Sequence, residues 1–87
     1  MLTVEYYTAA WCGPCKAFGP TMDSVMVEKG VSGYRKIDVD NNRELATANS
    51  VSSVPTVIFK VGDEIVHRQT GAMSRGQLIA MIDRYNS

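Results

Sequence analysis

Two cysteines, Cys12 and Cys15, are separated by two residues and are the only cysteines among the 87 residues of the chain. A thiolate can attack a disulfide sulfur, and a second thiol close by can then resolve the mixed disulfide that forms. A disulfide that closes so short a loop removes little entropy from the unfolded chain, so it would contribute little to stability. The spacing therefore indicates redox chemistry rather than a structural crosslink.

The residues around the cysteines predict where the pair lies. An alternating strand over Leu2–Tyr7 precedes it, and a helical pattern runs from Cys12 to about Lys29. Cys12 would therefore stand at a helix N-terminus, where unpaired backbone N–H groups and the helix dipole stabilise a thiolate. Pro14 suits the first helical turn, and Gly13 lets a partner approach the backbone closely.

Half of a zinc site is the alternative interpretation of the cysteine pair. Zinc sites in proteins use four ligands, commonly two such pairs or one pair with histidines. The chain holds one histidine, His67, and it falls inside a predicted strand. A site within one chain is therefore not expected, whereas a zinc ion shared by two chains stays open.

The rest of the chain predicts a mixed α/β fold in one domain, residues 1–87. Three further strands are predicted at Tyr34–Val39, Thr56–Val61 and Glu64–Gln69. The last two flank Gly62-Asp63, a two-residue turn that closes a hairpin. A short helix is expected over about 42–49, with Asp40 or Asn41 as its N-cap, and another opens at Ser74, where Gln77 completes a capping box. The order β-α-β-α-β-β-α describes a four-stranded mixed sheet with three helices.

Charge and hydropathy exclude several function classes. Nine basic residues balance nine acidic ones without a basic run, so a nucleic-acid partner is not expected. The longest apolar stretches, such as residues 54–59, are too short to cross a membrane. The chain begins directly with a strand, without a secretion signal, and does not spread cysteines as secreted mini-proteins do. We expect a monomer in the cytoplasm.

Several segments together resemble the thioredoxin family over nearly the whole chain. The pentapeptide Trp11-Cys12-Gly13-Pro14-Cys15 is specific to that family. Further similar segments are Pro20 within the first helix, Lys36–Asp40, Ser53–Thr56, and Gly71–Ser74 followed by Gln77-Leu78. The resemblance implies a minimal thioredoxin fold, without the N-terminal strand and helix of longer members. It also implies a protein disulfide reductase, re-reduced by thioredoxin reductase or a similar enzyme.

The resemblance also implies roles for individual residues. Cys12 would be the nucleophile and Cys15 the resolving thiol, and their disulfide would be the only redox group, with no cofactor and no metal. Pro55 would be a cis-proline opposite the cysteines, so that Val54 can pair with an extended substrate segment. Trp11, beside Cys12 in a loop, is expected to be partly exposed and to contact substrate. Gly71 is either a structural turn residue or part of the same face.

One position departs from the family pattern. Thioredoxins usually carry a buried aspartate in the first strand that accepts the proton of the resolving cysteine, and Tyr6 stands there instead. A phenol is a poor base at neutral pH. Strand alternation places the neighbouring Glu5 on the opposite face, and Glu5 is expected to be an ordinary solvated charge. Lys36, which matches the lysine that accompanies the aspartate, would serve only as a neutralising charge, and water is expected to take the proton.

Two other functions stay open at this point. A glutaredoxin-like protein that uses glutathione or serves ribonucleotide reductase would suit the small size, but the Gly-Pro dipeptide and residues 71–78 argue against it. No basic cluster near Pro55 is available to hold the carboxylates of glutathione. A non-catalytic interaction module could instead use an apolar face around Trp11, Val54 and Gly71.

Overall fold

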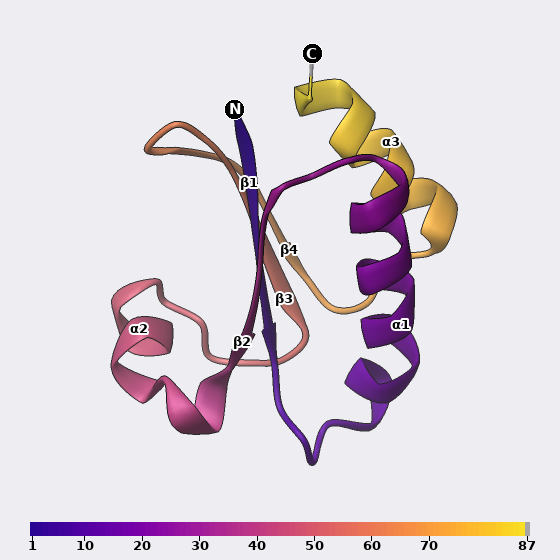
Figure 1. The fold of residues 1–87 in the computed structure, drawn as a ribbon. Helices are drawn as coiled ribbons and strands as arrows, with labels where there is room; N and C mark the ends of the chain where they lie inside the picture. The colour runs from indigo at the N-terminus through magenta and orange to yellow at the C-terminus, as the bar shows by residue number, and fades with distance from the viewer. Residues whose placement is uncertain (87) are drawn as a thin grey trace.

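Four strands form one mixed sheet in the order β2-β1-β3-β4 (Figure 1). The computed structural model describes residues 1–86. Its strands are β1 (Leu2–Thr8), β2 (Gly33–Asp38), β3 (Thr56–Val61) and β4 (Glu64–Thr70). β1 pairs with β2 in parallel and with β3 in antiparallel orientation, and β3 and β4 form the predicted antiparallel hairpin. The predicted four-stranded mixed sheet is therefore confirmed.

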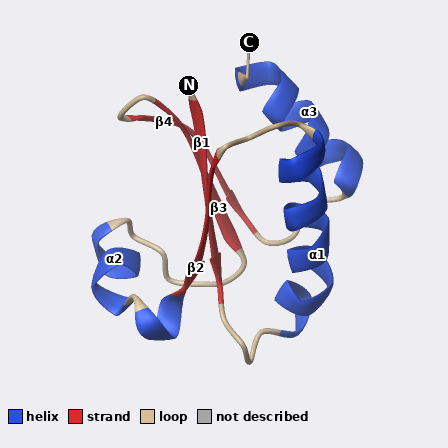
Figure 2. Ribbon diagram, in the orientation of Figure 1, coloured by secondary structure: helices blue, strands red, loops and turns tan. Residues whose placement is uncertain are grey.

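Helices cover both faces of this sheet. α1 (Gly13–Glu28) and α3 (Arg75–Tyr85) lie on one face, and the short α2 (Arg43–Ala48) lies on the other (Figure 2). Because side chains alternate along β1, Val4 and Tyr6 join the larger core beneath α1 and α3, whereas Tyr7 joins a smaller cluster beneath α2. This alternation decides which residues of β1 can reach the cysteines.

The ends of the helices agree with the predictions except at α2. Ser74 caps α3, and its capping box with Gln77 is present. The predicted N-cap of α2, Asp40 or Asn41, is wrong, because residues 39–41 form a 3₁₀ turn and Asn42 is the N-cap. The carboxylate of Asp38 accepts the backbone N–H of Asp40 at 2.9 Å and thereby caps this turn, so the α-helix begins only after it.

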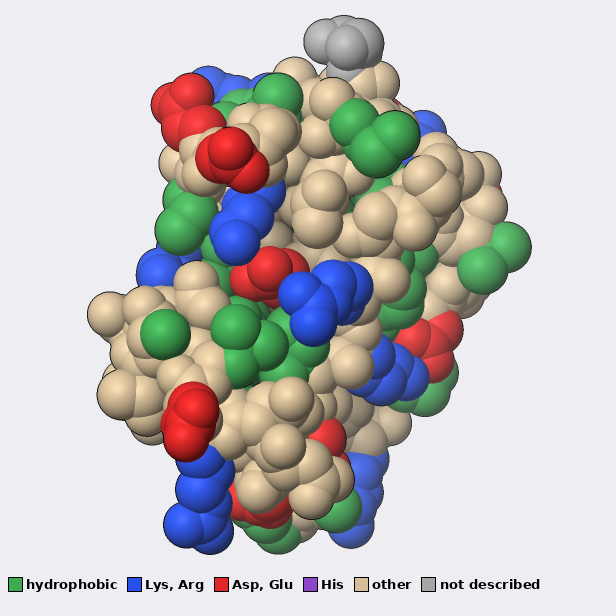
Figure 3. All heavy atoms as spheres, turned by 60° about the vertical axis from the view of Figure 1, so that its left-hand side comes forward, with side chains coloured by type: hydrophobic (Ala, Val, Ile, Leu, Met, Phe, Trp, Pro, Cys, Tyr) green, Lys and Arg blue, Asp and Glu red, His purple; other side chains and the backbone are tan. Residues whose placement is uncertain are grey.

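Three chain segments meet at the edge of the sheet where β1 ends. β1 leads into α1 there, the parallel β2 ends at the same edge, and the antiparallel β3 begins there. The cysteine pair, the segment after β2 and the segment before β3 are thus brought together by topology. Elsewhere, acidic and basic side chains are interspersed on the face shown in Figure 3, which agrees with the formal net charge of zero.

Candidate active site

Cys12 and Cys15 form a disulfide at the start of α1, with their Cα atoms 5.3 Å apart. Cys12 is the N-cap residue, with an extended backbone, and its Sγ accepts the backbone N–H of Cys15 at 3.2 Å. Pro14 occupies the first turn, where its missing N–H leaves no bond unmade. The predicted position of Cys12 is confirmed, and the same N–H that contacts the sulfur would stabilise it as a thiolate.

The loop before β3 lies against the cysteines. The Val54–Pro55 peptide bond is cis, as expected, and Pro55 is buried. The Pro55 carbonyl accepts the N–H of Gly71 at 2.8 Å, and Gly71 has a φ of +92°, which glycine adopts readily. Half-buried Val54 packs against the cluster of Ala9 and the two cysteines. The structure thus brings Val54, Pro55 and Gly71 together at the active-site edge.

Trp11 stands beside Cys12 with 68% of its surface exposed, as the sequence predicts. Its indole Nε1–H donates to Asp40 Oδ2 at 2.9 Å, which fixes the ring although most of it faces solvent. Between this ring and the proline loop lies a small hollow of about 100 Å³. The residues that line it are Trp11, Val39, Val51, Ser52, Ser53 and Val54.

Val39, Asp40 and Val51 are site residues that the sequence analysis missed. Val39 and Asp40 follow directly after β2. Because β2 is parallel to β1, their carboxyl ends meet at one edge of the sheet, and that rule could have placed Val39 and Asp40 near Cys12. Val51, which closes the hollow from the α2 side, carries no comparable signal in the sequence.

Tyr6 is fully buried beneath the first turn of α1. Its hydroxyl donates to the backbone carbonyl of Cys15 at 3.4 Å, and its ring meets Phe18 edge-on with the centroids 5.6 Å apart. Gly19 lies next to the phenol, and a Cβ there would be in ordinary van der Waals contact with the hydroxyl oxygen, at 3.7 Å. The phenol thus fills the space between β1 and the redox helix.

Glu5 lies on the opposite face of β1, as strand alternation predicts, but it is not the solvated charge that we expected. It is 5% exposed, and its carboxylate accepts the Tyr7 hydroxyl at 3.0 Å and Lys60 Nζ at 3.2 Å. Arg35 lies 3.9 Å away. Burial, followed by the hydrogen bond to Glu5, raises the pKa of Tyr7 to about 12. The burial is possible because Lys60, from β3, supplies the opposite charge.

Lys36 has its counterion on α1. Its Nζ donates to Asp23 Oδ2 at 2.7 Å, and the Tyr34 hydroxyl donates to Asp23 Oδ1 at 2.9 Å. Burial alone would raise the pKa of Asp23, but the bonds from Lys36 and Tyr34 outweigh it and hold the pKa of this carboxyl below its ordinary value. Burial, and then the bond to Asp23, raises the pKa of Tyr34. Lys36 therefore neutralises a helix carboxylate.

His67 lies on β4, half-buried against Phe59, with Nε2 3.3 Å from Gln69 Oε1. Over residues 1–86, no group of three or more His, Cys, Asp or Glu side chains is arranged to hold a metal ion. No helix within the same range is long and apolar enough to span a membrane.

A dithiol–disulfide pair at a helix N-terminus, facing a cis-proline loop at one edge of a mixed sheet, defines the class of thiol–disulfide oxidoreductases. A family model described as Thioredoxin matches residues 1–84. Thioredoxin of Chlamydia trachomatis is 35% identical over 86 residues, which cover 98% of this chain and 82% of the relative. Thioredoxin of Mycoplasmoides gallisepticum is 34% identical over 77 residues, which cover 88% of this chain and 76% of the relative.

Solved structures agree with the sequence relatives. A mutant thioredoxin from Halobacterium salinarum superposes with a TM-score of 0.90 at 31% identity, covering 99% of this chain and 75% of that one. The chain belongs to the thioredoxin family and has its fold. It is an oxidoreductase that acts by thiol–disulfide exchange through its redox-active cysteine pair, and the glutaredoxin-like and non-catalytic alternatives are not favoured. Disulfides are its substrates, and a reductase is its partner.

Proposed function

We propose that Cys12 attacks the disulfides of protein substrates and that Cys15 resolves the mixed disulfide. The Cys12 thiolate forms a bond to one substrate sulfur, and the other substrate sulfur leaves as a thiolate. The Cys15 thiolate then attacks Cys12 Sγ, and the second substrate thiolate leaves as the Cys12–Cys15 disulfide closes. Two electrons pass from the dithiol to the substrate, and the two released thiolates are protonated. The observation that carries this assignment is the position of Cys12 as the N-cap of α1.

The remaining site residues form the proposed substrate face. Exposed Trp11, Gly13 and Pro14 lie beside Cys12, while Val54, which precedes Pro55 in the loop before β3, packs against the cysteines. Gly71, joined to Pro55 by its N–H, extends this face toward α3. Tyr6 keeps the redox helix in place, and water takes the proton of Cys15.

We propose that the protein is a monomeric, cytoplasmic electron donor that thioredoxin reductase or a similar enzyme re-reduces. Both cysteines belong to one redox motif and none is used as a structural crosslink, which supports a location in a reducing compartment such as the cytoplasm. The test is consumption of NADPH with insulin as substrate, with thioredoxin reductase in one arm and glutathione plus glutathione reductase in the other. We expect turnover in the first arm only, and turnover in the glutathione arm alone would refute the proposal.

Variants of the two cysteines test the assigned roles in the same assay. Cys12→Ser should abolish insulin reduction and form no adduct with the substrate. Cys15→Ser should accumulate a mixed disulfide between Cys12 and insulin, detectable by mass spectrometry without reductant, because nothing resolves it. An adduct that forms in Cys12→Ser but not in Cys15→Ser would reverse the assignment.

A further inference from the structure

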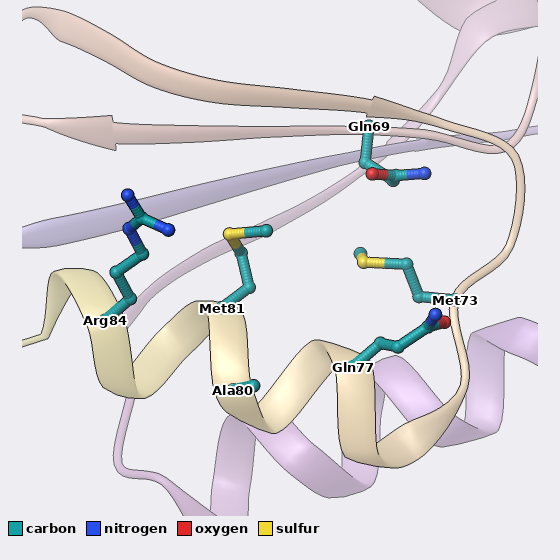
Figure 4. A pocket seen from close by; sticks show the side chains of 6 residues that line it. All are labelled: Gln69, Met73, Gln77, Ala80, Met81 and Arg84. Atoms are coloured by element: carbon teal, nitrogen blue, oxygen red, sulfur yellow. The ribbon is translucent and has the colours of Figure 1, made fainter.

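A second hollow lies away from the cysteines, between β4 and α3, and measures about 300 Å³ (Figure 4). Its lining residues are Gln69, Met73, Gln77, Ala80, Met81 and Arg84. Met73 is buried and Met81 half-buried, so two thioether side chains form the apolar part of the hollow. Methionine side chains adapt to apolar groups of different shapes, which suits a surface that receives several partners.

The polar groups of the hollow favour a negatively charged ligand. Arg84 stands at one end of the hollow and Gln77 at the other (Figure 4). None of the ion pairs among residues 1–86 includes Arg84, whose guanidinium lies 5.6 Å from the centre of the Tyr85 ring. Gln77 Oε1 already accepts the Ser74 N–H at 3.0 Å, so the amide presents its NH₂ group for further bonds. A carboxylate would complement these donors.

The hollow shares one lining residue, Met73, with a hollow that lies nearer the active site. Met73 also lines a neighbouring hollow of about 350 Å³ that extends past Phe18 to Pro14, next to the cysteine pair. Gly71, two residues before Met73, is bonded to the Pro55 carbonyl at 2.8 Å. A polypeptide held at Cys12 can therefore continue along the start of α3 and reach the β4–α3 hollow.

We propose that the β4–α3 hollow binds an acidic, apolar segment of the disulfide-bearing substrate protein. An aliphatic side chain of that segment lies between Met73 and Met81, and a neighbouring carboxylate meets Arg84. The hollow would thus select among protein substrates without touching the reacting sulfurs. This inference rests on the proposed function, because it assumes that a protein disulfide is attacked by Cys12.

The test uses two peptides with one central cysteine activated as a mixed disulfide with 2-thiopyridine. One peptide carries leucine and glutamate in both flanks, and in the other lysine replaces each glutamate. Flanks of ten residues extend about 33 Å, which is enough to span a molecule whose principal dimensions are 32 × 28 × 18 Å. Cys12 displaces thiopyridone from the activated cysteine, and Cys15 then releases the peptide thiol, so the released thiopyridone reports the rate of attack.

Charge reversal by Arg84→Glu is compared with Arg43→Glu, an exposed arginine of α2 that changes the net charge equally. The wild type should react faster with the acidic peptide, and Arg84→Glu should lower the acidic-to-basic rate ratio about fivefold, as expected for exposed ion pairs. Ala80→Phe, which fills the hollow without changing charge, should slow attack on the acidic peptide. Arg43→Glu should leave the ratio unchanged.

Neutral 2,2′-dipyridyl disulfide serves as the substrate without flanks. It should react at the same rate with every variant, because it contacts only the cysteines. Failure of this reaction in the wild type would refute the proposed function and would leave the docking surface unaffected. An unchanged ratio in Arg84→Glu would overturn the docking surface. A ratio lowered equally by Arg43→Glu would also overturn it, because the effect would then be one of net charge.

Discussion

Glu5 is the carboxylate nearest in sequence to the position where thioredoxins carry their buried aspartate, and its burial makes it a candidate base for Cys15. The structure argues against that role. Glu5 lies on the face of β1 opposite to Tyr6 and bonds to Tyr7 and Lys60, whereas Tyr6 is the residue of β1 that contacts the Cys15 carbonyl. We therefore predict that Glu5→Gln affects stability and leaves catalysis nearly unchanged.

The magnitude of the stability loss follows from the contacts of Glu5. The substitution removes the charge that pairs with Lys60, whose side chain is 23% exposed, while the amide oxygen can still accept one hydrogen bond. Hydrogen bonds to charged groups contribute about 1.5–3 kcal/mol, so we expect a loss of about 2 kcal/mol in the free energy of unfolding. In a domain of this size, that loss lowers Tm by roughly 10 °C.

The expected effect of Glu5→Gln on the rate of catalysis is much smaller than its effect on stability. Without a role in proton transfer, Glu5→Gln should change the rate of the resolving step by no more than about threefold, which is under 1 kcal/mol in the barrier. A lost general base would slow that step by about 10²–10⁴-fold. The two cases are therefore easily distinguished below the Tm of the variant.

Urea unfolding measures the stability, and rapid acid quench with mass spectrometry follows the mixed disulfide with insulin as it forms and decays. Glu64→Gln, at an exposed position of β4, is the matched control and should change neither quantity. The reasoning is refuted if Glu5→Gln slows decay of the mixed disulfide a hundredfold while Cys12 keeps its alkylation rate. An unchanged unfolding free energy would refute the assigned stabilising role.

Two further predictions concern α1. Brief treatment of the reduced protein with iodoacetamide should label Cys12 first, because its sulfur lies at the helix N-terminus; a peptide map with the label mainly on Cys15 would contradict this. Asp23→Asn should remove stability that is present above a pH of about 4, because the folded pKa of Asp23 lies below the unfolded one, held down by Lys36 and Tyr34. Urea unfolding from about pH 6 to about pH 2 should show the difference between wild type and variant shrinking as the pH falls, and a constant difference would contradict the assignment.

The sequence predicted those features that depend on neighbours along the chain. The capping box of α3 involves Ser74 and Gln77, three residues apart, and the cysteine pair lies within one helical turn, so local backbone geometry determines both. The opposite faces of Glu5 and Tyr6 follow from the two-residue period of a strand. The predicted N-cap of α2 was wrong because the Asp38 side chain favours a 3₁₀ turn that has no periodicity in the sequence.

Only the tertiary structure decided which distant residues meet. Glu5 is buried because Lys60, fifty-five positions away, pairs with it across β1 and β3, and Lys36 of β2 pairs with Asp23 of α1. Such contacts depend on sheet order and register, which place residues from separate segments side by side, and a single sequence carries no local signal of that placement. The redox chemistry of the dithiol thus depends on five consecutive residues, Trp11 to Cys15. The surface that surrounds the dithiol forms only when β1, β2, β3 and α3 have packed together.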